Sequence, residues 1–237
     1  MKGIVLAGGE GTRMKPLTDI DNKHLLPVGQ RRMVELPILT LISAGVDDIV
    51  LITGGKRPGT FLELLKDGSN LGCKHLHYTH QEGAGGIAEA LSKARPFMKE
   101  DERCVVILGD NYFEGSIASY LTEWDSGAGV LLVEVDEPWR YGVAEVGEYG
   151  QVISIEEKPS APKSNQIIPG LYMFDSQVWD FIDQIRPSSR GELEVTDLLR
   201  LYLDRQILSS WKHTSYWRDM GSISSWAEVV ERINNQE

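Results

Sequence analysis

Short apolar runs alternate with longer amphipathic stretches through the first half of the chain. Runs rich in valine, isoleucine and leucine occupy residues 3–7, 48–53, 104–109 and 129–135. These runs are bounded by glycine or polar residues and predict strands that are buried on both faces. The stretches between them predict helices at residues 33–44, 60–65, 86–94 and 116–124. Pro37 predicts a late start or a kink in the first helix, because proline is poorly tolerated inside a helix.

The alternation of strands and helices predicts βαβ units. We therefore expect an α/β fold with a Rossmann-like, mixed but mainly parallel sheet and helices on both faces. Ligands of such sheets bind at the carboxyl ends of the strands. Two segments take that position, residues 6–13 with the sequence LAGGEGTR and residues 107–111 with the sequence ILGDN.

The pattern changes after about Pro138. Residues 143–157 alternate between apolar and polar and turn between Gly147 and Gly150, which predicts an antiparallel hairpin. A further strand is expected at residues 167–174, followed by helices at residues 176–185, 194–204 and 224–233. Since no low-complexity linker or repeat divides the sequence, we expect one domain spanning residues 1–237.

Composition narrows the classes of function. The chain has 237 residues, of which 41% are hydrophobic, and a formal net charge of -11. That charge argues against a general binder of nucleic acid or anionic membranes, although a small basic pocket could still hold a phosphorylated ligand. Cys73 and Cys104 form neither a disulfide framework nor a metal motif. The apolar run after Lys2 is too short for a signal peptide, and no run approaches the roughly 18 apolar residues of a membrane span. We expect a cytoplasmic protein.

The glycine-rich segment at residues 6–13 matches neither of two familiar phosphate loops. Met14 stands where the third glycine of a dinucleotide fingerprint would be, and no glycine precedes a Lys-Ser or Lys-Thr pair as in a Walker A loop. Glycines still let backbone N–H groups approach an anion closely, and Arg13 can bind phosphate oxygens. Taken alone, the segment fits a phosphate cradle and a tight turn equally well.

Residues 22–28, NKHLLPV, follow that loop, and together they resemble the LAGGxGTR…K-x-LLPV motif of sugar-1-phosphate nucleotidyltransferases, in particular the glucose-1-phosphate thymidylyltransferases. Enzymes of this family transfer a nucleotidyl group from a nucleoside triphosphate to a sugar 1-phosphate and release pyrophosphate. The resemblance implies that Arg13 and Lys23 stabilise the departing pyrophosphate. It also implies that the triphosphate is wrapped by the loop residues Leu6, Ala7, Gly8, Gly9, Gly11, Thr12 and Arg13.

Residues 81–90, QEGAGGIAEA, resemble the nucleobase segment of the family. The Gln81 side chain offers a donor and an acceptor and can pair with the O4/N3 edge of thymine or uracil. Gly86 would let the base and ribose lie close to the backbone. Glu89 departs from the glutamine expected there, which leaves open how this helix meets the nucleotide. On its own, Gln81 would more simply be an exposed loop amide.

Asp110 directly follows an apolar strand in the segment LGDN, where a carboxylate can bind Mg²⁺ through its oxygens. In isolation such an aspartate is more often a turn residue or a helix cap. The resemblance implies that Asp110 is a catalytic, nucleotide-binding and metal-binding residue. It assigns the second metal ligand to Asp219 in the segment WRDMG, so the pairing of the two carboxylates is inherited from the family.

The second half of the chain resembles the sugar-binding segments of the family. By this resemblance Gly142 faces the sugar, Glu157 binds the hexose, and Lys158 binds the 1-phosphate. By the same resemblance, Gly170 and Tyr172 of the segment GLY belong to the sugar-phosphate site. The resemblance also implies that Arg190 is a second phosphate clamp there. Residues 1–135 would be mainly nucleotide-binding and residues 136–237 mainly sugar-binding.

Several positions depart from the family pattern. Pro169 replaces a threonine and puts local sugar contacts in doubt, because proline has no N–H. Arg32 precedes Met33 where the family has proline, and Ser222 and Ile223 replace Thr-His. We expect these to change detail without abolishing activity. Residues 75–80 also hold His75, His77 and His80, which fit an exposed edge strand better than a zinc site.

The implied reaction forms dTDP-glucose and pyrophosphate from dTTP and glucose 1-phosphate by Mg²⁺-dependent in-line attack on the α-phosphorus. The sugar phosphate is already a nucleophile, so no general base is needed. Two alternatives stay open: the same chemistry with UTP or another hexose 1-phosphate, and a regulator that binds a sugar nucleotide without catalysis. The chain ends soon after the helix expected at residues 224–233, which makes a C-terminal regulatory site doubtful and leaves a homo-oligomer open. Deoxysugar synthesis for a surface polysaccharide is the implied context.

Overall fold

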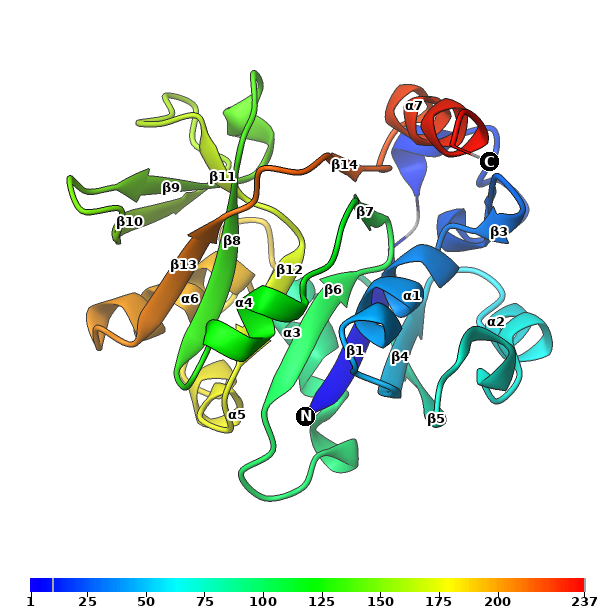
Figure 1. Cartoon of the computed structure of the whole chain (residues 1–237), viewed down its shortest axis with the longest axis horizontal. Helices are drawn as coiled ribbons and strands as arrows, with labels where there is room; N and C mark the ends of the chain where they lie inside the picture. Colours follow the sequence, from blue (N-terminus) through cyan, green and yellow to red (C-terminus); the bar gives the residue numbers. More distant parts are fainter. Residues whose placement is uncertain (10, 237) are drawn as a thin grey trace.

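The computed structural model describes residues 1–9 and 11–236. Its centre is a sheet of ten strands with the order β10-β9-β11-β8-β12-β6-β1-β4-β5, and β13 pairs with β8. Four neighbouring strands run parallel: β1 (Lys2–Ala7), β4 (Asp48–Gly54), β5 (His75–Gln81) and β6 (Cys104–Leu108). They confirm the parallel half of the sheet and, with β5 at its end, the edge strand expected at the three histidines (Figure 1).

Helices cover both faces of the sheet, as the alternation predicts. Successive residues of β1 point to opposite faces: Ile4 lies in a core with α3, α5 and α6, whereas Val5 lies in a core with α1, α2 and α4. On the first face are α3 (Ile87–Ser92), α5 (Val178–Ile182) and α6 (Val195–Asp204). On the second are α1 (Glu35–Ser43), α2 (Gly59–Leu65) and α4 (Ala118–Glu123). Pro37 lies in the first turn of α1, so the late start is confirmed.

The second half of the sheet is mainly antiparallel. Its antiparallel strands are β8 (Ala128–Glu134), β9 (Gly142–Val146), β10 (Val152–Glu157), β11 (Gln166–Ile168) and β12 (Leu171–Phe174). The remaining strand, β13 (Leu208–Lys212), pairs with β8 in parallel. The predicted hairpin is present as β9 and β10. The single strand predicted at residues 167–174 is wrong, because Pro169 cannot donate a ladder hydrogen bond and the chain breaks there into β11 and β12.

Two short strand pairs and the last helix lie outside the central sheet. The pairs are β2 (Pro27–Val28) with β3 (Arg31–Arg32), and β7 (Asn111–Phe113) with β14 (Trp217–Asp219). The last helix, α7 (Ile223–Asn234), is capped by Ser222, whose hydroxyl accepts from the Ser225 N–H at 3.2 Å. It lies beside the segment that follows β1 (Figure 1) and covers a small core of Met14, Val28, Met33, Met220 and Val229.

Within residues 1–9 and 11–236, no helix is long and apolar enough to cross a membrane. The described part of the chain also holds no group of three histidine, cysteine or acidic side chains placed to bind one metal ion. In β5, His77 Nε2 instead lies 3.3 Å from Asp48 Oδ1 on the neighbouring strand.

Candidate active site

Two cavities open at the carboxyl ends of the parallel strands and meet at Asp110. The larger has a volume of about 490 Å³ and the smaller a volume of about 210 Å³. Ile87, Leu108 and Asp110 line both. Because parallel strands end at the same edge, β1 and β6 deliver the glycine loop and Asp110 side by side, with Leu6 opposite Leu108 in the ladder.

Gly109 allows the close approach of these two strand ends. Its N–H donates to the Leu6 carbonyl at 2.8 Å. A Cβ at this position would lie 2.7 Å from His24 Cδ2 and 2.9 Å from the Leu6 oxygen, closer than atoms pack. Only glycine fits at position 109. Gly109 therefore allows β1 and β6 to lie close together where Asp110 enters the wall shared by the two cavities.

The smaller cavity gathers most of the residues predicted to bind the nucleotide. Lys23 lines it together with Leu6, Gly8, Gly9, Gln81, Gly86 and Asp110. Ala7, Gly11 and Thr12 line neither cavity, and Ala7 is fully buried in the core under the sheet. Arg13 lines the larger cavity. Its predicted contact with the departing pyrophosphate is therefore not evident from the cavity walls and stays a prediction.

Asp110 is buried and tightly held. Lys23 Nζ donates to its Oδ2, and Asn111 Nδ2 donates to its Oδ1 at 3.0 Å. Burial alone would raise the pKa of this carboxyl, but the charge and hydrogen bond of Lys23, with His24 and Asn111, hold the pKa well below its ordinary value. Asp110 is therefore an ionised carboxylate at neutral pH.

Asp219 comes from the other end of the chain and reaches the same cavity. It lies on β14, opposite Asn111 of β7, and the Met220 N–H donates to the Asp110 carbonyl at 2.8 Å. Burial and the negative charge of Asp110 raise the pKa of Asp219 to about 6. Its Oδ1 is buried and has no hydrogen-bond partner among the described residues. The structure thus brings the two predicted metal ligands together.

Asn111 joins the elements that carry these carboxylates. Its Oδ1 accepts from Trp217 Nε1 at 2.7 Å and from the Gly170 N–H at 3.2 Å, while its amide nitrogen donates to Asp110. One buried side chain therefore ties β6, β12 and β14 at a single point. Asn111 is part of the LGDN segment, but the sequence pattern predicted no role for it.

The larger cavity holds most of the predicted sugar-phosphate residues: Gly142, Glu157, Lys158, Gly170 and Tyr172. Gly142 and Glu157 face each other across the hairpin ladder. A Cβ at Gly142 would lie 2.8 Å from Thr196 Cγ2, so the glycine keeps this wall of the cavity open.

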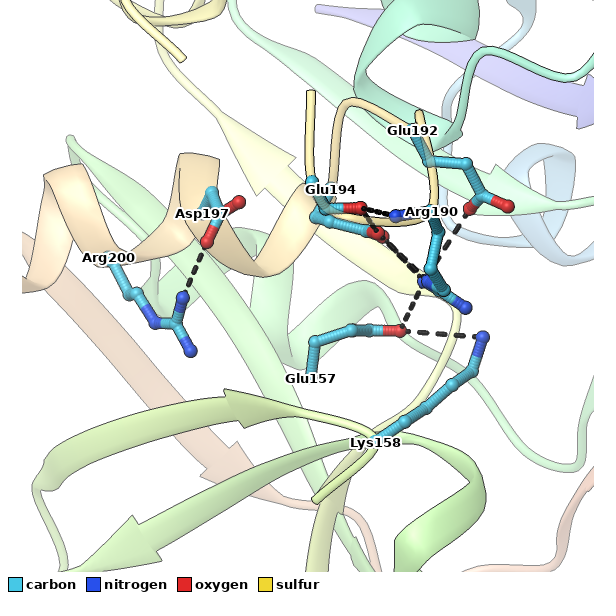
Figure 2. A network of polar contacts seen from close by, with 8 residues as sticks. Glu157, Lys158, Arg190, Glu192, Glu194, Asp197 and Arg200 are labelled. Atoms are coloured by element: carbon cyan, nitrogen blue, oxygen red, sulfur yellow. Dashed lines mark hydrogen bonds and ion pairs between the residues drawn. The ribbon is translucent and has the colours of Figure 1, made fainter. Parts of the chain in front are cut away.

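Arg190 lies at the edge of this arrangement and lines neither cavity. Figure 2 shows its guanidinium among three carboxylates: Glu194 at 2.8 and 2.9 Å, Glu157 at 3.3 Å, and Glu192 at 3.5 Å. The structure brings Arg190 beside the predicted hexose ligand Glu157. Its predicted role as a phosphate clamp stays a prediction, since the guanidinium is already engaged.

Thr196 is a wall residue that sequence reasoning passed over. It is 2% exposed and lines the larger cavity, and its Oγ1 has no hydrogen-bond partner among the described residues. A buried hydroxyl without a partner costs free energy, which a polar ligand in the cavity would recover. Thr196 follows the segment SRGELE at residues 189–194, which contains the predicted phosphate clamp Arg190, but nothing in the spacing shows where the hydroxyl lies.

The chain belongs to the Nucleotidyl transferase family, whose profile matches residues 2–236. Glucose-1-phosphate thymidylyltransferase of Xanthomonas campestris is 42% identical over 242 residues, covering 97% of this chain and 81% of that protein. The enzyme of the same name from Neisseria meningitidis is 39% identical over 247 residues, covering 99% and 85%.

Solved structures agree in fold. A Bacillus anthracis protein provisionally called a glucose-1-phosphate thymidylyltransferase, crystallised with sucrose, superposes with a TM-score of 0.91 at 42% identity, covering 98% of this chain and 94% of that one. A UDP-glucose pyrophosphorylase with bound UDP-glucose gives a TM-score of 0.86 at 21% identity, covering 100% and 99%. The latter likeness shows the fold alone. The expected α/β fold and the family resemblance are both confirmed.

Proposed function

We propose that this protein forms dTDP-glucose and pyrophosphate from dTTP and glucose 1-phosphate. The observation that carries the proposal is the meeting of two cavities at Asp110, with Asp219 on the wall of the larger one. A transfer reaction needs two substrates whose reacting groups touch, and two pockets with one shared polar wall meet that need. Relatives at 39–42% identity that carry this activity in their name support the choice of substrates.

The two carboxylates fit Mg²⁺. Asp110 is ionised, and Asp219 has a raised pKa and a buried Oδ1 that no other residue among 1–9 and 11–236 contacts by a hydrogen bond, so a cation would relieve an unfavourable pairing. Asp110 and Asp219 would hold the ion. When bound, Mg²⁺ would neutralise charge on the phosphate oxygens of both substrates.

Residues of the smaller cavity bind the nucleotide in this proposal. Gly8 and Gly9 present backbone N–H groups to the triphosphate, and Gln81 faces the base. Lys23, beside Asp110, stabilises negative charge on the departing pyrophosphate. Arg13 adds positive charge from the other side of Asp110, in the larger cavity.

The larger cavity binds the sugar phosphate. Glu157 accepts hydrogen bonds from hexose hydroxyls, and Lys158 holds the 1-phosphate, whose oxygen attacks the α-phosphorus directly. The division into residues 1–135 for the nucleotide and 136–237 for the sugar follows this assignment only in outline, since Arg13 lines the larger cavity and Glu192 the smaller. The same proposal places the protein in the cytoplasm with dTTP and glucose 1-phosphate as its substrates, and it leaves a homo-oligomer open.

The test is pyrophosphate release with Mg²⁺, each dNTP and NTP, and a panel of sugar 1-phosphates. Asp110→Asn should abolish release with a circular dichroism spectrum like that of the parent. Asp125→Asn, an exposed aspartate after α4, is the matched control and should retain full turnover. Unimpaired turnover of Asp110→Asn would refute the assignment. No pyrophosphate from any pair would favour a sugar-nucleotide-binding regulator, and a higher rate with UTP or another hexose would change the substrates.

A further inference from the structure

Gln81 ends β5 and is held by its own neighbourhood before any ligand arrives. The residue is 5% exposed and lines the smaller cavity. Its Nε2 donates to the carboxylate of Glu89, in the first turn of α3, and to the Gly86 carbonyl at 3.1 Å. Both hydrogens of the amide nitrogen are therefore used inside the protein.

This arrangement fixes which way the amide faces. A carboxylate and a backbone carbonyl only accept hydrogen bonds, so turning the amide over would place its oxygen against two other oxygens. The remaining atom, Oε1, faces Gly8 on the cavity wall: a Cβ built on Gly8 would lie 3.0 Å from it. From the sequence we expected Gln81 to offer a donor and an acceptor. The structure leaves only the acceptor.

We infer that Glu89 is a positioning residue that makes Gln81 select bases with an N3–H. Thymine and uracil carry a hydrogen on N3, which the fixed Oε1 can accept. Cytosine has a lone pair on N3, so the same edge would place two acceptors face to face. Specificity then comes from a built-in repulsion as much as from the matching hydrogen bond. This inference rests on the proposed function, since it assigns the base read in the smaller cavity.

Glu89 is suited to this task because its two oxygens have separate partners. One accepts from Gln81, and the other lies 2.5 Å from Lys93 Nζ, one turn further along the helix. A substitution at Lys93 removes the ion pair and leaves the carboxylate that faces the amide. The two positions therefore separate an effect of the carboxylate on Gln81 from an effect of the helix surface.

The experiment compares the parent protein with Glu89→Met and Lys93→Met. The readout is the ratio of kcat/KM for dTTP to that for dCTP, with glucose 1-phosphate and Mg²⁺ held constant. Glu89→Met removes one of the two acceptors that fix the amide, so that a reversed amide opposes only the Gly86 carbonyl. We expect the ratio to fall by about tenfold or more, the scale of one buried hydrogen bond and its clash. In Lys93→Met the ratio should stay within about twofold, since the amide keeps both acceptors.

Calorimetric binding of dTTP and dCTP to the same variants gives a second readout if Glu89→Met turns over too slowly. A ratio unchanged in Glu89→Met, or equal losses for both nucleotides, would overturn the inference and leave Glu89 a structural residue. A parent protein that releases no pyrophosphate from dTTP would instead overturn the proposed function. The two failures are thus distinguishable.

Discussion

The smaller cavity is lined mainly by residues from the first half of the chain, at or just after the ends of parallel strands, whereas much of the larger one is lined by residues from antiparallel strands and distant segments. In the smaller cavity, Gly8 and Gly9 follow β1 and Gln81 ends β5. In the larger, Asp219 and Thr196 come from the second half of the chain and line the same cavity as Asp110. The difference indicates that the position of the first pocket follows from the order of the parallel strands, whereas the second depends on packing between segments far apart in the sequence.

Lys23 belongs to the first kind of pocket and should have the largest effect. Lys23→Met leaves Asp110 buried without its ion-pair partner. We expect at least about 100-fold lower turnover, and a free energy of unfolding lower by about 3 kcal/mol in Mg²⁺-free buffer. Urea denaturation and pyrophosphate release measure the two effects.

A double variant, Lys23→Met with Asp110→Asn, separates them. Removing the second charge should recover part of the stability and none of the turnover. If the single variant were as stable as the parent, the ion pair would contribute nothing to this wall.

His24, in the wall of the smaller cavity, makes the free energy of unfolding depend on pH. Burial, together with the positive charge of Lys23, lowers the pKa of His24 from 6.5 to about 3. The unfolded chain therefore binds the proton first, so this stability is complete above about pH 6.5 and is lost as pH falls toward 3. Between pH 6.5 and 5 the loss should be about 2 kcal/mol.

The measurement is the unfolding free energy in urea across that pH range for the parent and His24→Asn. The asparagine amide can still donate to Asn22 Oδ1, as His24 Nδ1 does at 2.7 Å. We expect a flatter pH profile in the variant. Parallel profiles would show that His24 takes up no proton on unfolding in this range.

Thr196 tests the larger cavity with the smallest change. Thr196→Val keeps the shape of the side chain and removes the buried hydroxyl that has no partner among the described residues. We expect a KM for glucose 1-phosphate about fivefold higher, an unchanged KM for dTTP, and a free energy of unfolding higher by about 1 kcal/mol. Equal shifts in both KM values would show that the hydroxyl does not face the sugar.

The position of the smaller cavity could largely be predicted from the sequence. Strands such as residues 48–53 and 104–109 carry an apolar signal, and β4 and β6 appear within one residue of those bounds. Since parallel strands end at one edge, the glycine loop and Asp110 could be placed together from the pattern alone. Periodicity thus predicted the fold class and the edge of the sheet where the site lies, whereas the roles of Lys23, Gln81 and Gly86 came from the family resemblance.

The arrangement of the larger cavity could not be predicted from the sequence pattern in the same way. β7 and β14 have three residues each, too few for any periodic signal, so the pairing of Asp110 with Asp219 came from family resemblance. The engagement of Arg190 by Glu194, and the burial of the Thr196 hydroxyl without a hydrogen bond to the described part of the chain, depend on side-chain geometry that no spacing encodes. Even the strand break at Pro169, whose residue type hinted at it, appeared only in the structure.

The ladder between β7 and β14 also bears on how the protein is made. On the ribosome, Asp110 and Asn111 emerge long before their partner strand with Asp219, because the two segments lie far apart in the sequence. Until then the buried Asn111 amide lacks the indole of Trp217, and the carboxylate pair is incomplete. A nascent or prematurely terminated chain that lacks β14 can therefore form most of the sheet and still have no catalytic activity.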